Sequence, residues 1–487
     1  MNAPIRRLAT VVTVLFTALL ISTTYIQFVA GAALRDRAGN QRTLLATYSR
    51  ERGSILVGGA PIASSVVTRD ELKYRRTYPQ ARLYSQVTGY YSYIYGAGGG
   101  LEGTDNALLS GSSDKLFYRR VVDLVSGNQQ PGASIELTID AKAQAAADKG
   151  LGNQRGAVVA LDPRTGAVLA MVSHPQYDPS ALAGHTAAPV IAAWKSLIAD
   201  PERPAVNRAV NGDLYPPGST FKLVTAAAAL SSGRYTPSTL IPGPGTLKLP
   251  QTSATLPNHG NHSCATTSGG RTTVEHALVV SCNTAFGYLG LKLGGDALRK
   301  QADKFGFDTD LKLPLPVTPS VVPSGMNPPQ SAQSAIGQFD VRVSPLEMAM
   351  VSAAIANHGT LMSPYLVAQA RSSSLDVVDR TTPRRLSQAV TAAVAGDLQT
   401  MMLTVVKSGT GNHAQIPGVA VAGKTGTAEH GAGRAPHAWF TGFAPAGNPV
   451  VAVAVLVEDG GKAGQEGFGG TIAAPVAREV MKAVLGR

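Results

Sequence analysis

The stretch Tyr215-Pro216-Pro217-Gly218-Ser219-Thr220-Phe221-Lys222 leads directly into an alanine-rich run that ends near Leu230. Prolines and a glycine precede the run, and the run itself predicts a helix over Thr220–Leu230. Ser219 and Lys222 are three residues apart, so they lie on one face of that helix. A serine hydroxyl is a weak nucleophile until a base removes its proton. Lys222 can be that base only if burial or a neighbouring cation lowers its pKa.

Two further motifs follow along the chain. Ser281-Cys282-Asn283 lies between two apolar stretches, and Lys424-Thr425-Gly426-Thr427 follows the apolar run 419–422, which predicts a strand that lines a cleft. Each motif alone is common by chance, and the chain holds a looser copy of each: Ser112-Ser113-Asp114-Lys115, Ser126-Gly127-Asn128 and Lys407-Ser408-Gly409. The three together, in this order, are typical of active-site-serine enzymes that act on penicillins and on peptides ending in D-Ala-D-Ala.

The hydrophobic pattern around these motifs predicts an α+β domain. Short apolar, β-branched runs predict strands at both ends of the domain, over 135–139, 156–161, 167–173, 419–422 and 450–457. Periodic or alanine-rich runs predict helices over 140–150, 220–230, 273–293, 344–357 and 471–485. The strands therefore form one antiparallel sheet from segments that are distant in sequence. Two long loops rich in Pro, Gly and Ser, 241–270 and 317–331, are expected near the active site.

The N-terminus predicts a membrane anchor. Residues 8–34 contain no charged residue and no histidine, and the run exceeds the roughly 20 residues that a spanning helix needs. Arg6 and Arg7 precede it, so the positive-inside rule places residues 1–7 in the cytoplasm. A cleaved signal peptide is the alternative, because Ala30-Gly31-Ala32 resembles a cleavage site. The length of the run favours an uncleaved signal anchor, a single-pass protein of the cell membrane with its catalytic domain outside the cytoplasm.

Composition narrows the function classes. The chain of 487 residues has 43 Lys and Arg against 31 Asp and Glu, a formal net charge of +12. A basic chain suits nucleic acid, anionic lipid or an acidic polymer, and the extracytoplasmic topology removes nucleic acid from these partners. Hydrophobic residues make up 44% of the chain, which excludes a mostly disordered protein. Its 2 cysteines exclude a disulfide framework and a multi-cysteine metal array.

The segment between the anchor and the catalytic motifs forms a smaller module. Residues 35–125 are rich in Arg and Tyr and predict an irregular, strand-bearing, non-catalytic module. Residues 126–134 have the composition of a linker. The catalytic domain is then expected over 135–487.

Taken over its whole length, the sequence resembles class B penicillin-binding proteins. Besides the three motifs, the likeness rests on Arg50–Ile55, Gly100–Glu102, Leu137–Asp140, Asn207–Ala209, Ile336–Gln338 and Ser344–Ala349. The resemblance implies a serine β-lactamase-like transpeptidase domain, in which a five-stranded antiparallel sheet has helices on both faces. A transmembrane helix and a dimerisation or pedestal module would precede it. After Ile55 this chain has Leu56-Val57-Gly58-Gly59 where many relatives have an Asp-Arg-Asn-Gly-like turn.

The resemblance also implies a role for each motif residue. Ser219 would attack the carbonyl of a penultimate D-Ala, and Lys222 would accept its proton. The remaining motif side chains would relay protons, hold Lys222 and bind the substrate carboxylate: Ser281, Asn283, Lys424, Thr425 and Thr427. The backbone around Gly426 would shape the oxyanion hole, formed by the N–H groups of Ser219 and Thr427. No cofactor or metal is implied. The implied partners are peptidoglycan stem peptides with their lipid-linked precursor, β-lactam antibiotics, and a membrane glycosyltransferase that supplies glycan strands.

The two cysteines predict one disulfide. Cys264 and Cys282 are 18 residues apart and lie outside the reducing cytoplasm. A zinc site made by His259, His262 and these cysteines is the alternative, although the loop is rich in Gly and Asn and the chemistry needs no metal. His430 and His437 are expected to line the substrate groove or to pack beneath it.

Three other functions share some of these features. A D,D-carboxypeptidase differs only in using water to deacylate. A secreted β-lactamase would be shorter and unanchored. It would also need a deacylation base, and the sequence shows no Glu-bearing loop of the class A type between the Ser281 and Lys424 motifs. A non-catalytic scaffold that binds wall polymers does not need the intact motif set. The sequence therefore favours a membrane-anchored peptidoglycan D,D-transpeptidase.

Overall fold

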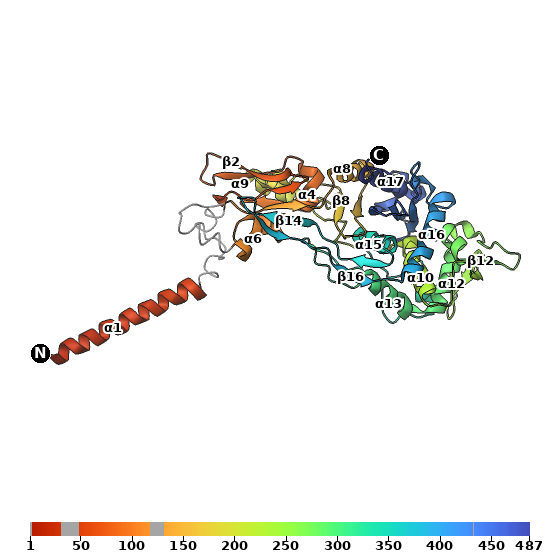
Figure 1. Ribbon diagram of the computed structural model, residues 1–487, viewed down its shortest axis with the longest axis horizontal. Helices are drawn as coiled ribbons and strands as arrows, with labels where there is room; N and C mark the ends of the chain where they lie inside the picture. The colour runs from red at the N-terminus through yellow and green to blue at the C-terminus, as the bar shows by residue number, and fades with distance from the viewer. Residues whose placement is uncertain (1, 31–47, 117–130, 432) are drawn as a thin grey trace.

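A single apolar helix begins the molecule. The computed structural model describes residues 2–30, 48–116, 131–431 and 433–487. Helix α1 (Asn2–Thr24) continues into a π-helical turn (Tyr25–Val29) and stands apart from the remaining elements (Figure 1). The span Ala3–Gln27 has a mean hydropathy of 1.9, and none of it is buried in the protein. Its length and composition fit the predicted membrane anchor. Helix α1 includes most of the predicted cytoplasmic tail. Residues 31–34 lie outside the described residues, and so therefore do Gly31 and Ala32 of the alternative cleavage site.

A six-stranded sheet builds the N-terminal module. Strands β1 and β2 form a hairpin whose turn, Gly58-Gly59, has positive φ at both residues (56° and 77°), as a tight two-residue turn requires. Strand β6 pairs in parallel with β1 and antiparallel with β14. The order is β15-β14-β6-β1-β2-β3, with bounds Val377–Arg380, Val367–Arg371, Ser134–Leu137, Ile55–Val57, Ala60–Val67 and Tyr74–Thr77.

This sheet contains three strands from the predicted catalytic domain. Residues 134–137 and 367–380 complete it, so the N-terminal module and the catalytic part share one sheet (Figure 1). Linker composition indicates where a chain is polar, and it does not indicate which strands pair. Residues 126–130 of the predicted linker lie outside the described residues. Beneath the sheet the buried Glu102 carboxylate accepts hydrogen bonds from Arg52 and Arg76 at 2.5 and 2.6 Å, which fixes the module internally.

A five-stranded antiparallel sheet is the centre of the catalytic part. Its order is β17-β18-β19-β7-β8, with bounds Ala422–Ala428, His437–Ala444, Val451–Val457, Gly156–Leu161 and Val168–His174. Alternate residues of β7 enter different cores. Val158 packs with α8 (Ala141–Leu151) and α17 (Ala473–Val484), whereas Val159 belongs to the core that contains α15 (Pro345–Ala356). The predicted sheet with helices on both faces is therefore confirmed.

The helical region between the strand groups contacts the edge strand β17 through α16 (Ala392–Ser408) and through the 3₁₀ turn that precedes α10 (Lys222–Ser231). Its central helix, α10, is buried from Lys222 to Leu230. The predicted helix 273–293 is in fact two helices, α11 (Val274–Val279) and α12 (Asn283–Leu293). The chain breaks at Ser281, which has a φ of 59° and so cannot continue a right-handed helix. Further helices of this region are α13 (Gly295–Phe305) and α14 (Pro328–Ser334).

Candidate active site

A tight helical turn positions Ser219. The 3₁₀ turn Gly218–Phe221 precedes α10, and Gly218 has a φ of 52°. A Cβ on Gly218 would come within 2.6 Å of the Thr427 carbonyl oxygen, so glycine lets the helix start lie directly against β17. Ser219 is half-buried at this junction. Among the described residues its hydroxyl has no hydrogen-bond partner, which leaves the oxygen open to a substrate.

Lys222 lies at the centre of the site and is completely buried. Its Nζ donates hydrogen bonds to the Ser281 carbonyl at 2.6 Å and to Asn283 Oδ1 at 2.7 Å, and it lies 3.3 Å from Ser281 Oγ. Burial, followed by the charge of Lys424, holds the pKa of Lys222 well below its usual value. A neutral amine with two donated hydrogen bonds keeps a lone pair, so Lys222 can accept a proton.

Lys424 provides a second buried amine on β17. Its Nζ donates to Ser281 Oγ at 2.9 Å and to the Thr425 carbonyl at 2.9 Å. Burial lowers the pKa of Lys424 to about 7. The Ser281 hydroxyl thus lies between two amines that come from opposite sides of the cleft. The positive φ of Ser281 turns this residue out of the helical path and toward both of them.

The rest of the Lys424 motif forms one wall of the site. Thr425 is buried, and its hydroxyl is 2.6 Å from the Thr410 hydroxyl. Thr427 is half-buried beside Gly218. A Cβ on Gly426 would approach the Pro217 carbonyl oxygen to 2.9 Å. Thr410 was missed by the sequence reasoning, although it directly follows the looser copy Lys407-Ser408-Gly409, which ends α16.

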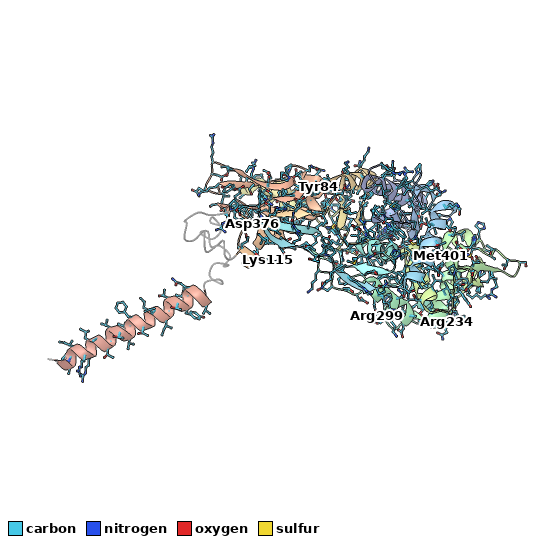
Figure 2. The ribbon with its side chains drawn as sticks, in the orientation of Figure 1. Tyr84, Lys115, Arg234, Arg299, Asp376 and Met401 are labelled. Carbon is cyan, nitrogen blue, oxygen red and sulfur yellow. A yellow bond between two sulfur atoms is a disulfide. The ribbon has the colours of Figure 1, made fainter. Side chains whose placement is uncertain are left out.

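The structure brings the five predicted catalytic residues together and leaves the looser copies elsewhere. Lys115 forms an exposed ion pair with Asp379 on β15. Figure 2 shows Lys115 beside the N-terminal module, away from Met401 of α16, the helix that packs on β17. Lys407 is exposed at the end of α16. The copy Ser126-Gly127-Asn128 lies outside the described residues.

A disulfide supports the Ser281–Asn283 motif. Cys264 and Cys282 are bonded, with their Cα atoms 6.2 Å apart. Beside this bond Asn258 accepts a hydrogen bond from the Thr284 N–H at 3.0 Å and donates to the His262 carbonyl at 2.9 Å. The loop 241–270 is therefore tied to the start of α12. Because both sulfur atoms are bonded to each other, neither is available as a thiolate for the alternative zinc site.

Loss of this disulfide should destabilise the protein. We expect alkylation of the native protein to modify no cysteine, and alkylation after denaturation and reduction to modify both. Closing a loop of this size contributes roughly 3 kcal/mol in the chain-entropy model. The free energy of unfolding of the double variant Cys264→Ser/Cys282→Ser should therefore be lower by about that amount. A denaturant titration would show this as unfolding at a lower denaturant concentration. Two thiols that react without reductant would contradict the bond.

His430 and His437 stack beyond the end of β17. Their rings are 3.7 Å apart and nearly parallel, at 3°, and their nitrogens lie within 4.8 Å of an Asp459 carboxylate oxygen. Imidazole lone pairs lie in the ring plane, so two parallel stacked rings do not direct their lone pairs at one metal ion. Burial, followed by the charge of His430, lowers the pKa of His437 to about 4. His437 is therefore neutral at pH 7, and its Nδ1 accepts the Asp459 N–H at 3.2 Å.

Comparisons with known proteins agree with this geometry. Residues 156–482 match the family model of the penicillin binding protein transpeptidase domain, and residues 52–135 match that of the penicillin binding protein A dimerisation domain. Peptidoglycan D,D-transpeptidase PbpA of Mycolicibacterium smegmatis is 43% identical over 494 residues, which cover 100% of this chain and 99% of the relative.

Two solved structures are similar to this chain over most of its length. The ceftriaxone acyl-enzyme complex of penicillin-binding protein A from M. tuberculosis has a TM-score of 0.86 and 40% identity, and the match covers 91% of this chain and 100% of that one. Its penicillin G acyl-enzyme complex has a TM-score of 0.84 and 40% identity, and covers 90% of this chain and 100% of that one.

Proposed function

The chain belongs to the class B penicillin-binding proteins, and we propose that it is a membrane-anchored peptidoglycan D,D-transpeptidase with Ser219 as its nucleophile. The observation that carries the residue assignment is the buried Lys222 amine, which joins Ser281 and Asn283 one helical turn from Ser219. β-Lactams acylate enzymes of this family, as the acyl-enzyme complexes of the M. tuberculosis protein illustrate, and Ser219 is the residue they would acylate here.

Acylation is the first half of the reaction. Ser219 Oγ attacks the carbonyl carbon of the penultimate D-Ala while its proton passes to the lone pair of Lys222. The backbone N–H groups of Ser219 and Thr427 stabilise the negative oxygen, and each such donor is typically worth about 3 to 4 kcal/mol. The peptide bond to the terminal D-Ala then breaks. Ser281, which both lysines contact, returns the proton to the leaving amine, and an ester to Ser219 remains.

Deacylation by an amine makes the cross-link. An amine of a neighbouring stem peptide attacks the ester carbonyl, and Lys222 accepts the proton that this amine loses. The C–O bond to Ser219 breaks, a peptide bond has formed, and the proton returns to Ser219 Oγ. Lys424 stays cationic in this scheme, and its charge attracts the carboxylate of the donor and keeps the pKa of Lys222 low. Thr425 and Thr427 supply hydroxyls near that carboxylate.

The cellular setting is part of the same proposal. The apolar helix α1 anchors the chain, the short tail with Arg6 and Arg7 is cytoplasmic, and the catalytic part is extracytoplasmic. The bond between Cys264 and Cys282 supports an oxidising compartment. The two matched family regions are a dimerisation module and a transpeptidase domain. We therefore assign glycan polymerisation to a separate membrane glycosyltransferase.

Product analysis distinguishes transpeptidation from hydrolysis. The detergent-solubilised full chain is incubated with a D-Ala-D-Ala donor peptide and a peptide that bears an acceptor amine. We expect mass spectrometry to show the cross-linked dimer together with one free D-Ala for each cross-link. Donor shortened by one D-Ala without any dimer would indicate a D,D-carboxypeptidase. Release of no D-Ala by protein that does bind donor would indicate the non-catalytic scaffold.

A further inference from the structure

A cavity of about 660 Å³ opens beyond the end of β17. The catalytic residues do not line it. Its walls come from the segment that leads to Ser219, which includes Tyr215, from the residues after β17, and from the first residue after β19, Glu458. The proposed mechanism therefore gives no role to this cavity, whose wall includes Pro216, three residues before Ser219.

The floor of this cavity is a fixed ionic cluster. The buried Glu458 carboxylate accepts hydrogen bonds from Arg208 Nε and from the Tyr215 hydroxyl, both at 2.7 Å, and a further one from Arg155. Burial by itself would raise the pKa of Glu458, but the Tyr215 hydrogen bond and the two arginine charges outweigh it and hold the pKa below its usual value. Every group in this floor is already paired within the protein.

Charged groups of both signs at the wall are not fully paired: Glu429, Arg342 and Arg434, of which Arg434 has its Nη2 3.6 Å from the Asp459 carboxylate. Glu429 is exposed, and within the described parts of the chain its carboxylate has no ion-pair partner. Arg342 is half-buried, and its Nη1 donates to two backbone carbonyls at 3.0 Å. Among the residues that the structure describes, its Nη2 has only the exposed Asp340 carboxylate as an ion-pair partner, at 3.6 Å. The other acids near the cavity have partners, since Asp213 pairs with Arg203 and Glu202 with Arg155.

The Gln338 side chain fixes the backbone of Glu429, the first residue after β17. The Gln338 side-chain amide donates to the Glu429 carbonyl at 3.2 Å and accepts a hydrogen bond from the Glu429 N–H at 3.1 Å. Glu429 is two residues beyond Thr427, so the two residues share one face of the extended chain. The path from Thr427 to Glu429 is roughly 7 Å at the rise of a strand.

The direction of the donor peptide follows from the proposed chemistry. The donor carboxylate lies toward Lys424, and the scissile carbonyl lies at the Thr427 N–H. The acyl part of the donor must therefore continue along β17 in the other direction, toward Glu429. One residue of an extended peptide covers about 3.4 Å, and a long side chain adds several more. The residue that precedes the penultimate D-Ala, the third residue of the stem peptide, thus reaches the cavity.

We propose that this cavity receives the side chain of the third residue of the donor stem peptide and selects one that ends in both an ammonium and a carboxylate. Glu429 pairs with the ammonium and Arg342 with the carboxylate. A lysine side chain would leave Arg342 without a partner, and an alanine side chain would leave both groups unused. The inference rests on the proposed function, because the direction of the donor is taken from it.

Four acyl donors test this specificity. Three are stem peptides that differ only in their third residue, which is meso-2,6-diaminopimelate, lysine or alanine. The fourth, benzoyl-D-alanyl-thioglycolate, has no third residue and measures the catalytic machinery alone. For the full-length protein we expect kcat/KM of acylation to be about tenfold higher for the diaminopimelate donor than for the lysine donor, and lowest for alanine, because a site built for a polar group discriminates against donors that lack it.

Two charge-removing variants locate the selectivity. Arg342→Gln should reduce the diaminopimelate-to-lysine ratio to within about threefold of unity, because only the diaminopimelate donor loses a partner. Glu429→Gln removes the partner of the ammonium that both donors carry, so it should lower kcat/KM for both and reduce the lysine-to-alanine ratio to within about threefold of unity. Glu466→Gln and Arg380→Gln, which remove exposed charges outside the cavity, should keep both original ratios. Three outcomes overturn the inference alone if the thioester still acylates the protein. They are equal kcat/KM for the three peptides, an unchanged diaminopimelate-to-lysine ratio in Arg342→Gln, and an unchanged lysine-to-alanine ratio in Glu429→Gln. Failure of the thioester to acylate the wild-type protein overturns the proposed function, and the inference with it.

Discussion

The variant Ser219→Ala is expected to lose all covalent labelling by a fluorescent penicillin and all release of D-Ala from a donor peptide. Without Oγ no ester can form, and the only other serine in the site, Ser281, is held between Lys222 and Lys424 by its hydrogen bonds. Ser219 is half-buried and its hydroxyl has no partner among the described residues. The substitution should therefore leave the thermal unfolding temperature nearly unchanged while it removes the activity.

The looser copy of the motif supplies a matched control. Ser112→Ala, in the sequence Ser112-Ser113-Asp114-Lys115, should label at the wild-type rate because Lys115 is exposed and paired with Asp379. Gel fluorescence after denaturation and intact-protein mass spectrometry measure both variants. A penicilloyl adduct on Ser219→Ala protein that is correctly folded would show that another residue is the nucleophile.

The parts of the fold that the sequence predicts are those with a simple local pattern. The runs 156–161, 167–173 and 450–457 are apolar and β-branched, and the structure contains strands at each of them. The alanine-rich run after Lys222 forms the buried helix α10. The order of the three motifs does not by itself select the catalytic set, because the looser copies at 112–115, 126–128 and 407–409 follow the same order. The apolar and alanine-rich runs that flank Ser219, Ser281 and Lys424 distinguish the predicted set from those copies.

The parts that the sequence does not predict depend on tertiary contacts. Strand β18 contains Thr441 and Gly442 and so interrupts the apolar pattern, yet it is buried throughout. The Thr441 hydroxyl lies 2.7 Å from the Ser352 hydroxyl and donates to the Met348 carbonyl at 2.8 Å, and both partners are on α15. A buried polar residue satisfied by a distant helix cannot be recognised from its neighbours in sequence.

The remaining differences have the same origin. The shared six-stranded sheet depends on pairing between residues 55–56 and 135–136 and between residues 134–137 and 367–371. The break at Ser281 depends on a left-handed residue that the flanking apolar pattern does not reveal. The cavity beside Glu429 is formed by five separate segments. Each of these features requires the folded chain, which is also why the proposed third-residue selectivity could not be inferred from the motifs.

Replacement of Lys222 should separate its role as a base from its charge. Lys222→Arg keeps a cation at this position, but a guanidinium stays protonated in proteins and cannot accept the Ser219 proton. Lys222→Met removes both the charge and the base. Since a positioned general base typically contributes 10² to 10⁴ in rate, we expect both variants to acylate with penicillin roughly a thousandfold more slowly than the wild type. Lys407→Arg, in the exposed copy of the motif, should not change the rate.

The pH dependence of acylation gives the sharper test of Lys222. Its pKa is held low by burial and by the charge of Lys424, so the rate should rise with pH as Lys222 loses its proton, at a pH well below that of an ordinary lysine. The rate should fall again as Lys424, with a pKa of about 7 in the free protein, loses the charge that attracts the substrate carboxylate.

Lys424→Gln removes a like charge beside Lys222, so the pKa of Lys222 must increase and the rising limb must move to higher pH. Because the two amines titrate as a coupled pair, the limbs report apparent pKa values of the pair. A rising limb that keeps its position in Lys424→Gln would contradict the assignment of Lys222 as the base.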